Sequence, residues 1–269
     1  MAKFDNILLF GCGNMAGAML DGWLAGGIPA ANFTVYTRTH RPLPEGVEQV
    51  HEVPTDRTFD AVMIGVKPQY LDDVVDQLEP AMGPETAVFS ILAGVEYASL
   101  AARFPRAGAI VRIMPNLACA LGKSPIALGD TGLDDAGREA ITTLMEPLGT
   151  PVWLGEEEEF HAVTALAGSG PAFVYRFIDA LAGAAEELGV EKEAAEQLAK
   201  AMVEGASLLA GSSEFSPGEL ADKVASPGGV TRAGMNVMDE DGAINKLMLA
   251  TLTSARKRSA EMAEEARKG

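Results

Sequence analysis

The sequence predicts an α/β domain followed by an all-α domain. Over the first 155 residues, short apolar or β-branched runs alternate with longer stretches of helical periodicity, which is typical of βαβ units on a largely parallel sheet. A glycine-rich turn directly follows the first apolar run. After residue 155 the strand-like runs stop, and long segments rich in Ala, Leu and Glu follow. We therefore place one domain over residues 1–155 and a helical domain over residues 156–269.

Seven runs in the first part have the length and composition of strands. They are Asn6–Phe10, Phe33–Thr37, Asp60–Val66, Thr86–Ile91, Ala109–Ile113, Pro125–Leu128 and Pro151–Leu154. Four segments between them have the apolar spacing of helices. They are Met15–Ala25, Gln69–Met82, Glu96–Arg103 and Asp134–Leu148. We expect these helices to cover both faces of the sheet.

The second part is predicted to be helical over three segments: Glu157–Gly189, Glu191–Gly211 and Ile244–Arg267. The last two carry broad apolar faces, which include Leu198, Met202, Leu208, Leu209, Leu247 and Met248. These faces are larger than a domain of this size would cover by itself. We expect burial against a second copy of the chain; the alternative is that the helices simply pack on one another.

Composition narrows the classes of partner. The 269 residues are 48% hydrophobic, which suits a packed core and excludes a disordered or disulfide-scaffold protein. Lys and Arg total 21 against 38 Asp and Glu, and both halves share this acidic excess. Nucleic acid and anionic membranes need concentrated positive charge, so neither is expected as a partner. An anionic ligand must instead be met by backbone N–H groups and a few Arg residues.

Cysteine and histidine usage predicts the setting. Only Cys12 and Cys119 are present, and no charged-then-apolar leader precedes the first strand-like run, so we expect a reduced, cytoplasmic environment. No apolar stretch reaches the ~20 residues that cross a bilayer. The three histidines and two cysteines have unrelated spacings and predict no metal site.

The turn after the first strand has the pattern G-x-G-x-x-A and opens a helix. Glycines let the backbone approach a pyrophosphate at the positive end of a helix, so this strand, turn and helix predict a Rossmann-type dinucleotide site. Its candidate residues are Gly11, Gly13, Asn14, Met15 and Ala16. The alternative is a tight turn without a ligand.

The second strand ends at Thr37-Arg38-Thr39, where NAD-binding proteins usually place a carboxylate for the ribose 2′-hydroxyl. Arg38 can pair with a 2′-phosphate, and nothing beside it repels one. With Thr37, it predicts NADP as cofactor and NADPH in preference to NADH. The alternative is an exposed Arg38 with no role in binding.

Two further segments lie at carboxyl ends of predicted strands, where open α/β sheets bind ligands. They are Val66-Lys67-Pro68 and Met114-Pro115-Asn116. Proline stops the strand ladder and presents neighbouring polar groups at the rim. Val66, Lys67, Pro68 and Asn116 are therefore candidate cofactor contacts, although each segment alone could equally be a strand terminator.

Two segments of the helical part interrupt its periodicity. Ser226-Pro227-Gly228-Gly229 separates two helical patterns, and consecutive glycine N–H groups at a helix start form a nest suited to a small carboxylate. A plain turn between helices is the alternative. Gly168-Ser169-Gly170-Pro171 lies inside a helical run, where Pro171 frees a carbonyl one turn earlier. A pocket-lining role and a structural kink both remain open for this segment.

With these segments in this order and spacing, the chain closely resembles the pyrroline-5-carboxylate reductase family from Ile7 to about Ala263. That family makes L-proline, in the last step of its biosynthesis, by NAD(P)H reduction of a cyclic imine. The resemblance implies substrate contacts from Ser226, Gly228, Gly229, Val230 and Thr231. It also implies that Thr231 is the catalytic hydroxyl at the ring nitrogen, with water as the competing proton source. Dimers through the helical domain, which can assemble into a decamer, are implied as well.

The chain departs from the family pattern between Arg38 and Phe59. This link is short and rich in proline, so the helix normally found there is expected to be truncated or absent. Glu52 falls where members of the family often carry Asn beside the adenine ribose, which leaves the strength of the NADPH preference open.

Two other functions remain as alternatives. A β-hydroxyacid dehydrogenase or related imine reductase shares the plan of the fold, but such dehydrogenases place a catalytic Lys on the long helix between domains. No lysine occurs from Glu157 to Val190. A non-catalytic dinucleotide sensor would keep the glycine turn and lose the carboxylate nest, whereas this sequence has both.

Overall fold

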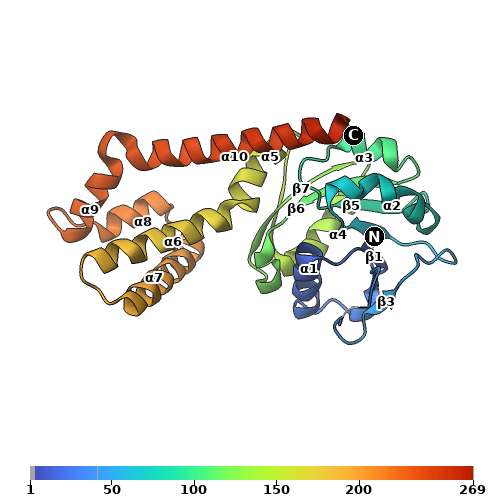
Figure 1. Cartoon of the computed structure of the whole chain (residues 1–269), viewed down its shortest axis with the longest axis horizontal. Coiled ribbons are helices and arrows are strands. Elements are labelled where there is room, and N and C mark those ends of the chain that lie inside the picture. Colours follow the sequence, from blue (N-terminus) through green and yellow to red (C-terminus); the bar gives the residue numbers. More distant parts are fainter. Residues whose placement is uncertain (1–3, 41, 269) are drawn as a thin grey trace. The chain divides into compact units, whose positions relative to one another are not determined.

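The computed structural model describes residues 4–40 and 42–268, which form two compact units (Figure 1). The first unit takes in the described residues up to Gly168 together with those from Ala255 onward. The second comprises Ser169–Ser254. The α/β and all-α parts that the sequence predicts are both present, and the assignment of domains to residues 1–155 and 156–269 stays a prediction.

The described residues of the first unit contain an eight-stranded sheet with the order β3-β2-β1-β4-β5-β6-β7-β8. The strands are β1 (Ile7–Phe10), β2 (Phe33–Tyr36), β3 (Glu48–Val50), β4 (Ala61–Ile64), β5 (Ala87–Ser90), β6 (Ala109–Met114), β7 (Ser124–Thr131) and β8 (Gly149–Trp153). Every neighbouring pair is parallel except β6 and β7. The prediction of a largely parallel sheet is confirmed, and all seven predicted strands are found.

Helices cover both faces of this sheet. They are α1 (Asn14–Ala25), α2 (Leu71–Leu78), α3 (Tyr97–Arg103), α4 (Asp135–Met145) and the short α5 (Glu159–Val163). Helices α1 and α4 pack on one face, and α2 and α3 pack on the other. Within the predicted helix Gln69–Met82, only α2 is α-helical. A 3₁₀ turn precedes it at Pro68–Tyr70 and another follows it at Glu79–Ala81, and in each turn a proline lacks the backbone N–H donor.

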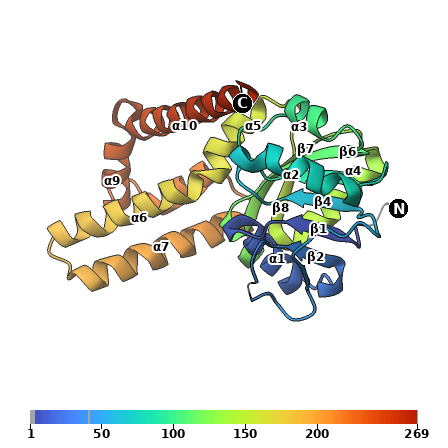
Figure 2. The same ribbon diagram turned by 45° about the vertical axis from the view of Figure 1, so that its right-hand side comes forward.

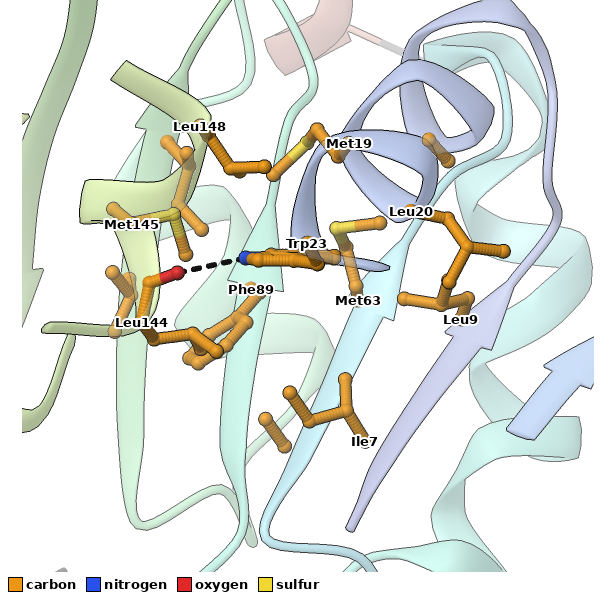
Figure 3. Packing of buried hydrophobic residues seen from close by; sticks show 14 of the residues in the cluster. Ile7, Leu9, Met19, Leu20, Trp23, Met63, Phe89, Leu144, Met145 and Leu148 are labelled. Carbon is orange, nitrogen blue, oxygen red and sulfur yellow. Dashed lines mark hydrogen bonds between the residues drawn. The ribbon is translucent and has the colours of Figure 1, made fainter. Parts of the chain in front are cut away.

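Trp23 anchors the core beneath α1. Its ring is fully buried and stacks on Phe33 with a centroid distance of 5.2 Å. The indole Nε1 donates a hydrogen bond of 2.8 Å to the carbonyl of Leu144, as Figure 3 shows. This bond satisfies the one polar atom of a large apolar side chain, so the last turn of α1 is firmly packed against the core.

The link between β2 and β4 lacks its usual helix. Among its described residues, 37–40 and 42–60, the only regular element is the three-residue strand β3, which pairs with β2 at the edge of the sheet. The expectation of a truncated or absent helix is confirmed there, and the strand in its place was not predicted.

The second unit is helical throughout its regular elements. They are α6 (Gly170–Glu187), α7 (Lys192–Ser212), α8 (Pro217–Val224), α9 (Val230–Asp239) and the first part of α10 (Ala243–Lys268). Helices α6 and α7 run side by side (Figure 2), with Ala182, Ala195 and Ala199 buried between them. Small side chains at this contact let the two helices approach closely.

Candidate functional site

The glycine turn after β1 is held by close backbone contacts. Gly11 has a φ of +88°, which favours glycine, and its N–H donates to the carbonyl of Tyr36 over 3.1 Å. Gly65, which follows β4, faces this turn so closely that a Cβ there would lie 2.2 Å from the carbonyl oxygen of Gly11. Both positions therefore need glycine, and the turn is fixed by strands on either side of β1.

Gly13 has free space around it, whereas Gly11 is crowded by neighbouring backbone. Gly13 is the N-cap of α1, it is exposed, and a Cβ there would meet nothing within 4 Å. No side chain caps this helix, so the backbone N–H groups of its first turn remain available to an anion. Asn14 is exposed and Met15 half-buried at the helix start, while Ala16 is buried beside Gly65. These features fit a dinucleotide pyrophosphate.

The end of β2 carries the predicted 2′-phosphate contacts. Thr37 is buried, and its side-chain hydroxyl accepts a hydrogen bond of 2.8 Å from the Nε2 of Gln49. Arg38 is exposed, and no carboxylate of the described residues lies within ion-pair distance of it. Glu52 is exposed in the loop after β3. A guanidinium without an internal partner is suited to an anionic ligand.

The segment after β4 turns away from the sheet at Pro68. Lys67 has extended backbone and is exposed, and its carbonyl accepts a hydrogen bond of 3.0 Å from the N–H of Tyr70. Val66 is half-buried, and its Cγ1 would lie 3.3 Å from a Cβ at Gly11. Val66 therefore lies beside the glycine turn, at the same edge of the sheet.

Asn116, after β6, is committed to internal contacts. It is buried, its Oδ1 accepts from the N–H of Ala118 over 2.9 Å, and its Nδ2 donates to the carbonyl of Ala167 over 3.0 Å. Ala167 stands four residues before Pro171, which has no N–H to donate to that carbonyl. Asn116 thus satisfies the carbonyl that Pro171 frees.

That contact explains the irregular stretch between α5 and α6. Residues Thr164–Gly168 form a π-helical turn, and Pro171 is the second residue of α6. A wide turn of this kind arises where a helix gains a residue, and such turns are frequent at functional sites. The helical run is thus irregular directly before Gly168-Ser169-Gly170-Pro171, and the structural kink and the pocket-lining role proposed for this segment both stay predictions.

A buried ion pair ties α5 to the sheet. The Nη1 of Arg112 lies 2.7 Å from an Oε1 of Glu157, and the guanidinium lies 4.2 Å from the ring centroid of Phe160. The same Glu157 oxygen accepts the N–H of Tyr97 over 2.6 Å. Burial raises the pKa of Tyr97 to about 12, against the opposing pull of Arg112. These contacts join the segment before α5 to β6 and to the start of α3.

The predicted carboxylate nest lies between α8 and α9. The N–H of Gly229 donates to the carbonyl of Ser226 over 3.0 Å, and Gly228 has a φ of +73°. Proline at the second position and a left-handed glycine at the third are the requirements of a type II turn. Gly229 is the N-cap of α9, and no side chain caps it. A Cβ at Gly228 would meet nothing within 4 Å, so this turn is open to a ligand.

The first residues of α9 present side chains next to this turn. Val230 is 93% exposed, and Thr231 is exposed one residue further on. Arg232 follows, and its Nη2 lies 2.7 Å from an Oδ1 of Asp222 on α8. This pair links the two helices that flank the turn, and it leaves the Thr231 hydroxyl accessible.

Comparison with known proteins identifies the chain's relatives. Residues 157–262 match the family model for pyrroline-5-carboxylate reductase dimerisation. Over 96% of its length the chain is 34% identical to pyrroline-5-carboxylate reductase of Pseudomonas aeruginosa, covering 97% of that protein. The chain belongs to the pyrroline-5-carboxylate reductase family. It is also 32% identical to the second such reductase of Bacillus subtilis, over 95% of this chain and 94% of that one.

Solved structures agree with this membership. The reductase of Coxiella burnetii superposes with a TM-score of 0.89 at 30% identity, covering 97% of this chain and 99% of that one. The enzyme of Plasmodium falciparum, solved with NADP bound, has the same fold with a TM-score of 0.81 at 22% identity, covering 96% of this chain and 98% of that one. Pyrroline-5-carboxylate reductases are NAD(P)-dependent oxidoreductases, so the dehydrogenase and sensor alternatives are rejected.

Sequence reasoning missed three residues that shape the site. Gly65 could have been found, because a glycine ending a strand beside the glycine turn signals a close approach of two backbones. Gln49 and His51 had no such signal, because their contacts with Thr37 depend on the unpredicted strand β3.

Within the described residues, no helix is long and apolar enough to span a bilayer, and no cluster of three potential metal ligands is found.

Proposed function

We propose that this chain reduces L-1-pyrroline-5-carboxylate to L-proline with NAD(P)H. The observation that carries the proposal is the presence, in a member of this family, of two open helix N-termini with glycine N-caps, at Gly13 and at Gly229. The first suits a dinucleotide pyrophosphate and the second a small carboxylate. Bound NAD(P)H supplies a hydride to the imine carbon, and the imine nitrogen gains a proton.

The cofactor would be held at the edge of the sheet near the glycine turn. Gly11, Gly13, Asn14, Met15 and Ala16 would surround the pyrophosphate, with Val66, Lys67 and Pro68 beside it. The open space at Gly13 and the uncapped start of α1 support this assignment. Asn116 would act by fixing the segment around Ala167 and through any remaining amide hydrogen, since its carboxamide is already bound on both sides.

NADPH is the preferred reductant in this proposal, through Arg38 and Thr37. Arg38→Ala should weaken NADPH binding by ~1.5–3 kcal/mol, because a charge-assisted contact to the 2′-phosphate is lost. NADH binding should stay nearly unchanged. Fluorescence titration with each nucleotide measures both constants, and Arg38→Lys is the matched control that keeps the charge. Equal losses for NADPH and NADH would reject the preference.

The substrate carboxylate would bind the turn Ser226-Pro227-Gly228-Gly229 through the N–H groups of Gly228, Val230 and Thr231, with the Ser226 hydroxyl nearby. Gly229 would contribute by closing the turn, because its own N–H donates to the carbonyl of Ser226. The left-handed φ of Gly228 and the uncapped start of α9 support this role. Thr231 would donate a hydrogen bond to the ring nitrogen. Thr231→Ala should lower kcat/KM for the imine by about tenfold, while Thr231→Ser should retain activity. Full turnover by Thr231→Ala would leave water as the proton source.

The assembly in this proposal is a homodimer through the helical unit, and the dimers associate into a decamer. Apolar side chains exposed on α7 and α10 of the single chain support it: Leu198, Met202, Leu208, Leu209, Leu247 and Met248. Light scattering at dilute concentration tests the dimer and the decamer separately.

A cytoplasmic setting is proposed as well, supported by two buried cysteines that form no disulfide within the described residues.

One assay tests reaction and cofactor together. Wild-type protein is mixed with L-pyrroline-5-carboxylate and either NADPH or NADH, and both nucleotide absorbance and proline are measured. We expect one proline for each NADPH consumed and a higher KM for NADH. Consumption of NADPH without proline would contradict the proposed reaction.

A further inference from the structure

The short strand β3 lies beside the end of β2, where Arg38 begins the loop. Register places Tyr36 opposite Val50, so the two strands end together. On the other side of β2, the Tyr36 carbonyl accepts the N–H of Gly11 over 3.1 Å. The glycine turn, the end of β2 and the end of β3 are therefore connected by backbone hydrogen bonds within a single unit.

Thr37 is held at three points by strand β3 and by His51, the residue that follows it. Its N–H donates to the carbonyl of Val50 over 3.1 Å, and its hydroxyl accepts from the Nε2 of Gln49 over 2.8 Å. Its carbonyl lies 2.7 Å from the Nδ1 of His51. A carbonyl only accepts, so Nδ1 carries the proton of this bond. The side chain of Gln49 therefore holds the hydroxyl of Thr37, and the side chain of His51 holds its carbonyl, in the residue directly before Arg38.

Arg38 has no comparable support of its own. Its side chain is exposed, and no carboxylate of residues 4–40 or 42–268 lies within ion-pair distance. A long, mobile side chain loses substantial rotamer freedom when it binds a phosphate. The direction in which Arg38 leaves the sheet is set by the backbone of Thr37. That backbone is held by the Val50 carbonyl and by His51, and Gln49 holds the side chain of the same residue.

We propose that His51 and Gln49 are positioning residues for the 2′-phosphate of NADPH. They act through Thr37 on the direction of Arg38 and do not touch the nucleotide themselves. In this chain, the described part of the link contains strand β3 where the family usually has a helix. The strand supplies Gln49, and His51 directly follows it. The inference rests on the NADPH preference proposed above.

Equilibrium binding without turnover provides the test. Dissociation constants for NADPH, NADH and 2′,5′-ADP are measured by fluorescence titration or calorimetry for wild type, His51→Ala and Gln49→Leu. We expect each variant to weaken NADPH and 2′,5′-ADP by about three- to tenfold, because one hydrogen bond that fixes Thr37 is lost. NADH should change by less than about twofold. Thr55→Ala, an exposed neutral change in the same link, is the matched control and should match wild type.

Two further variants separate positioning from direct contact. His51→Asn should recover most of the NADPH affinity, because its Nδ2 can take the place of the imidazole Nδ1 toward the Thr37 carbonyl. In an Arg38→Ala background, His51→Ala should cause no additional loss, since a residue that acts through Arg38 has nothing left to position. Urea unfolding of each variant checks that the fold itself is retained.

The results that would overturn the positioning role differ from those that would also overturn the NADPH preference. Equal weakening of NADPH and NADH by His51→Ala, or additive losses with Arg38→Ala, would overturn positioning while leaving the NADPH preference standing. So would wild-type NADPH affinity in both His51→Ala and Gln49→Leu. If Arg38→Ala alone leaves NADPH affinity at the wild-type value, both the preference and the positioning role are overturned.

Discussion

Two glycine turns precede helix starts in this chain, and they are built in opposite ways. The turn at Gly11–Gly13 lies between packed strands, with Gly65 so close that neither backbone has room for a side chain. At the turn Gly228–Gly229, a Cβ added to Gly228 would meet no atom within 4 Å, so this glycine has open space around it. The first turn needs glycine because of its close neighbours as well as the positive φ of Gly11, whereas Gly228 in the second turn needs it because of φ alone.

The two supporting Arg–carboxylate pairs differ in the same way. Arg112 is 3% exposed and is enclosed by Glu157 and Phe160, whereas Arg232 and Asp222 meet at the surface between α8 and α9. Exposed pairs contribute little to stability, and buried ones are costly to break. The glycine turn of the proposed nucleotide site is fixed separately, by the close approach of Gly65 to Gly11, while the proposed carboxylate site depends on local turn chemistry. A substitution at the crowded position Gly65 should affect folding, whereas substitutions at the open positions Gly13 and Gly228 should mainly affect ligand binding.

The largest effect is expected at Gly65. Gly65→Ala places a methyl group 2.2 Å from the Gly11 carbonyl oxygen, so β1 and β4 must separate. We expect the free energy of unfolding to fall by about 2–3 kcal/mol, together with loss of nucleotide binding. Urea denaturation and NADPH titration measure the two effects. Wild-type stability in this variant would show that the glycine turn is not held by the contact between the strands.

Gly13→Ala separates binding from folding at the same turn. Its φ of −73° suits any residue and a Cβ there meets nothing within 4 Å, so stability should stay within about 0.5 kcal/mol of wild type. The added methyl occupies space proposed for the pyrophosphate, so the Kd for NADPH should rise roughly tenfold or more. An unchanged Kd would place the phosphates away from this helix start.

The sequence predicted the regular parts of the first region because local pattern decides them. Buried strands such as Ile7–Phe10 are apolar runs, and the glycine turn has a fixed spacing. Strand β3 escaped because Glu48-Gln49-Val50 is short and mixed in polarity, and only pairing with β2 makes it a strand. The π-helical turn at Thr164–Gly168 escaped because the missing donor of Pro171 is compensated by Asn116, which lies 51 residues before Ala167.

The candidate residues of the proposed sites also differ in how well local sequence predicts them. Candidates defined by backbone, such as Gly13 and Gly228, lie in open turns as their sequence patterns indicate. Side-chain candidates are less predictable, because the partner of a side chain is chosen by the tertiary fold. Asn116 was expected to face the cofactor and is bound to Ala118 and Ala167, while His51 was not considered and contacts Thr37.

A smaller effect is expected at Gly228. Gly228→Ala forces a side chain into a left-handed conformation, which costs about 1 kcal/mol, but it meets no neighbour. We expect a modest loss of stability and a roughly fivefold rise in KM for the imine as the turn relaxes. Gly228→Asn should recover part of the loss, since Asn tolerates this φ. Gly218→Ala, in helix α8, is the matched control and should leave KM unchanged.

The smallest effect concerns pH and belongs to the rigid region. Burial raises the pKa of Tyr97 from 10.0 to about 12, so the folded protein holds this proton more tightly than the unfolded chain. The resulting stabilisation is complete below pH 10 and is lost as the pH rises toward 12. The effect is modest because the ring is only half-buried and solvent screens it. Tyr97→Phe should flatten the fall in unfolding free energy between these pH values. The difference in tyrosinate absorbance between the two proteins should titrate near pH 12; titration near 10 would mean that the phenol is solvated and that this part of the core is looser than the packing around Arg112 requires.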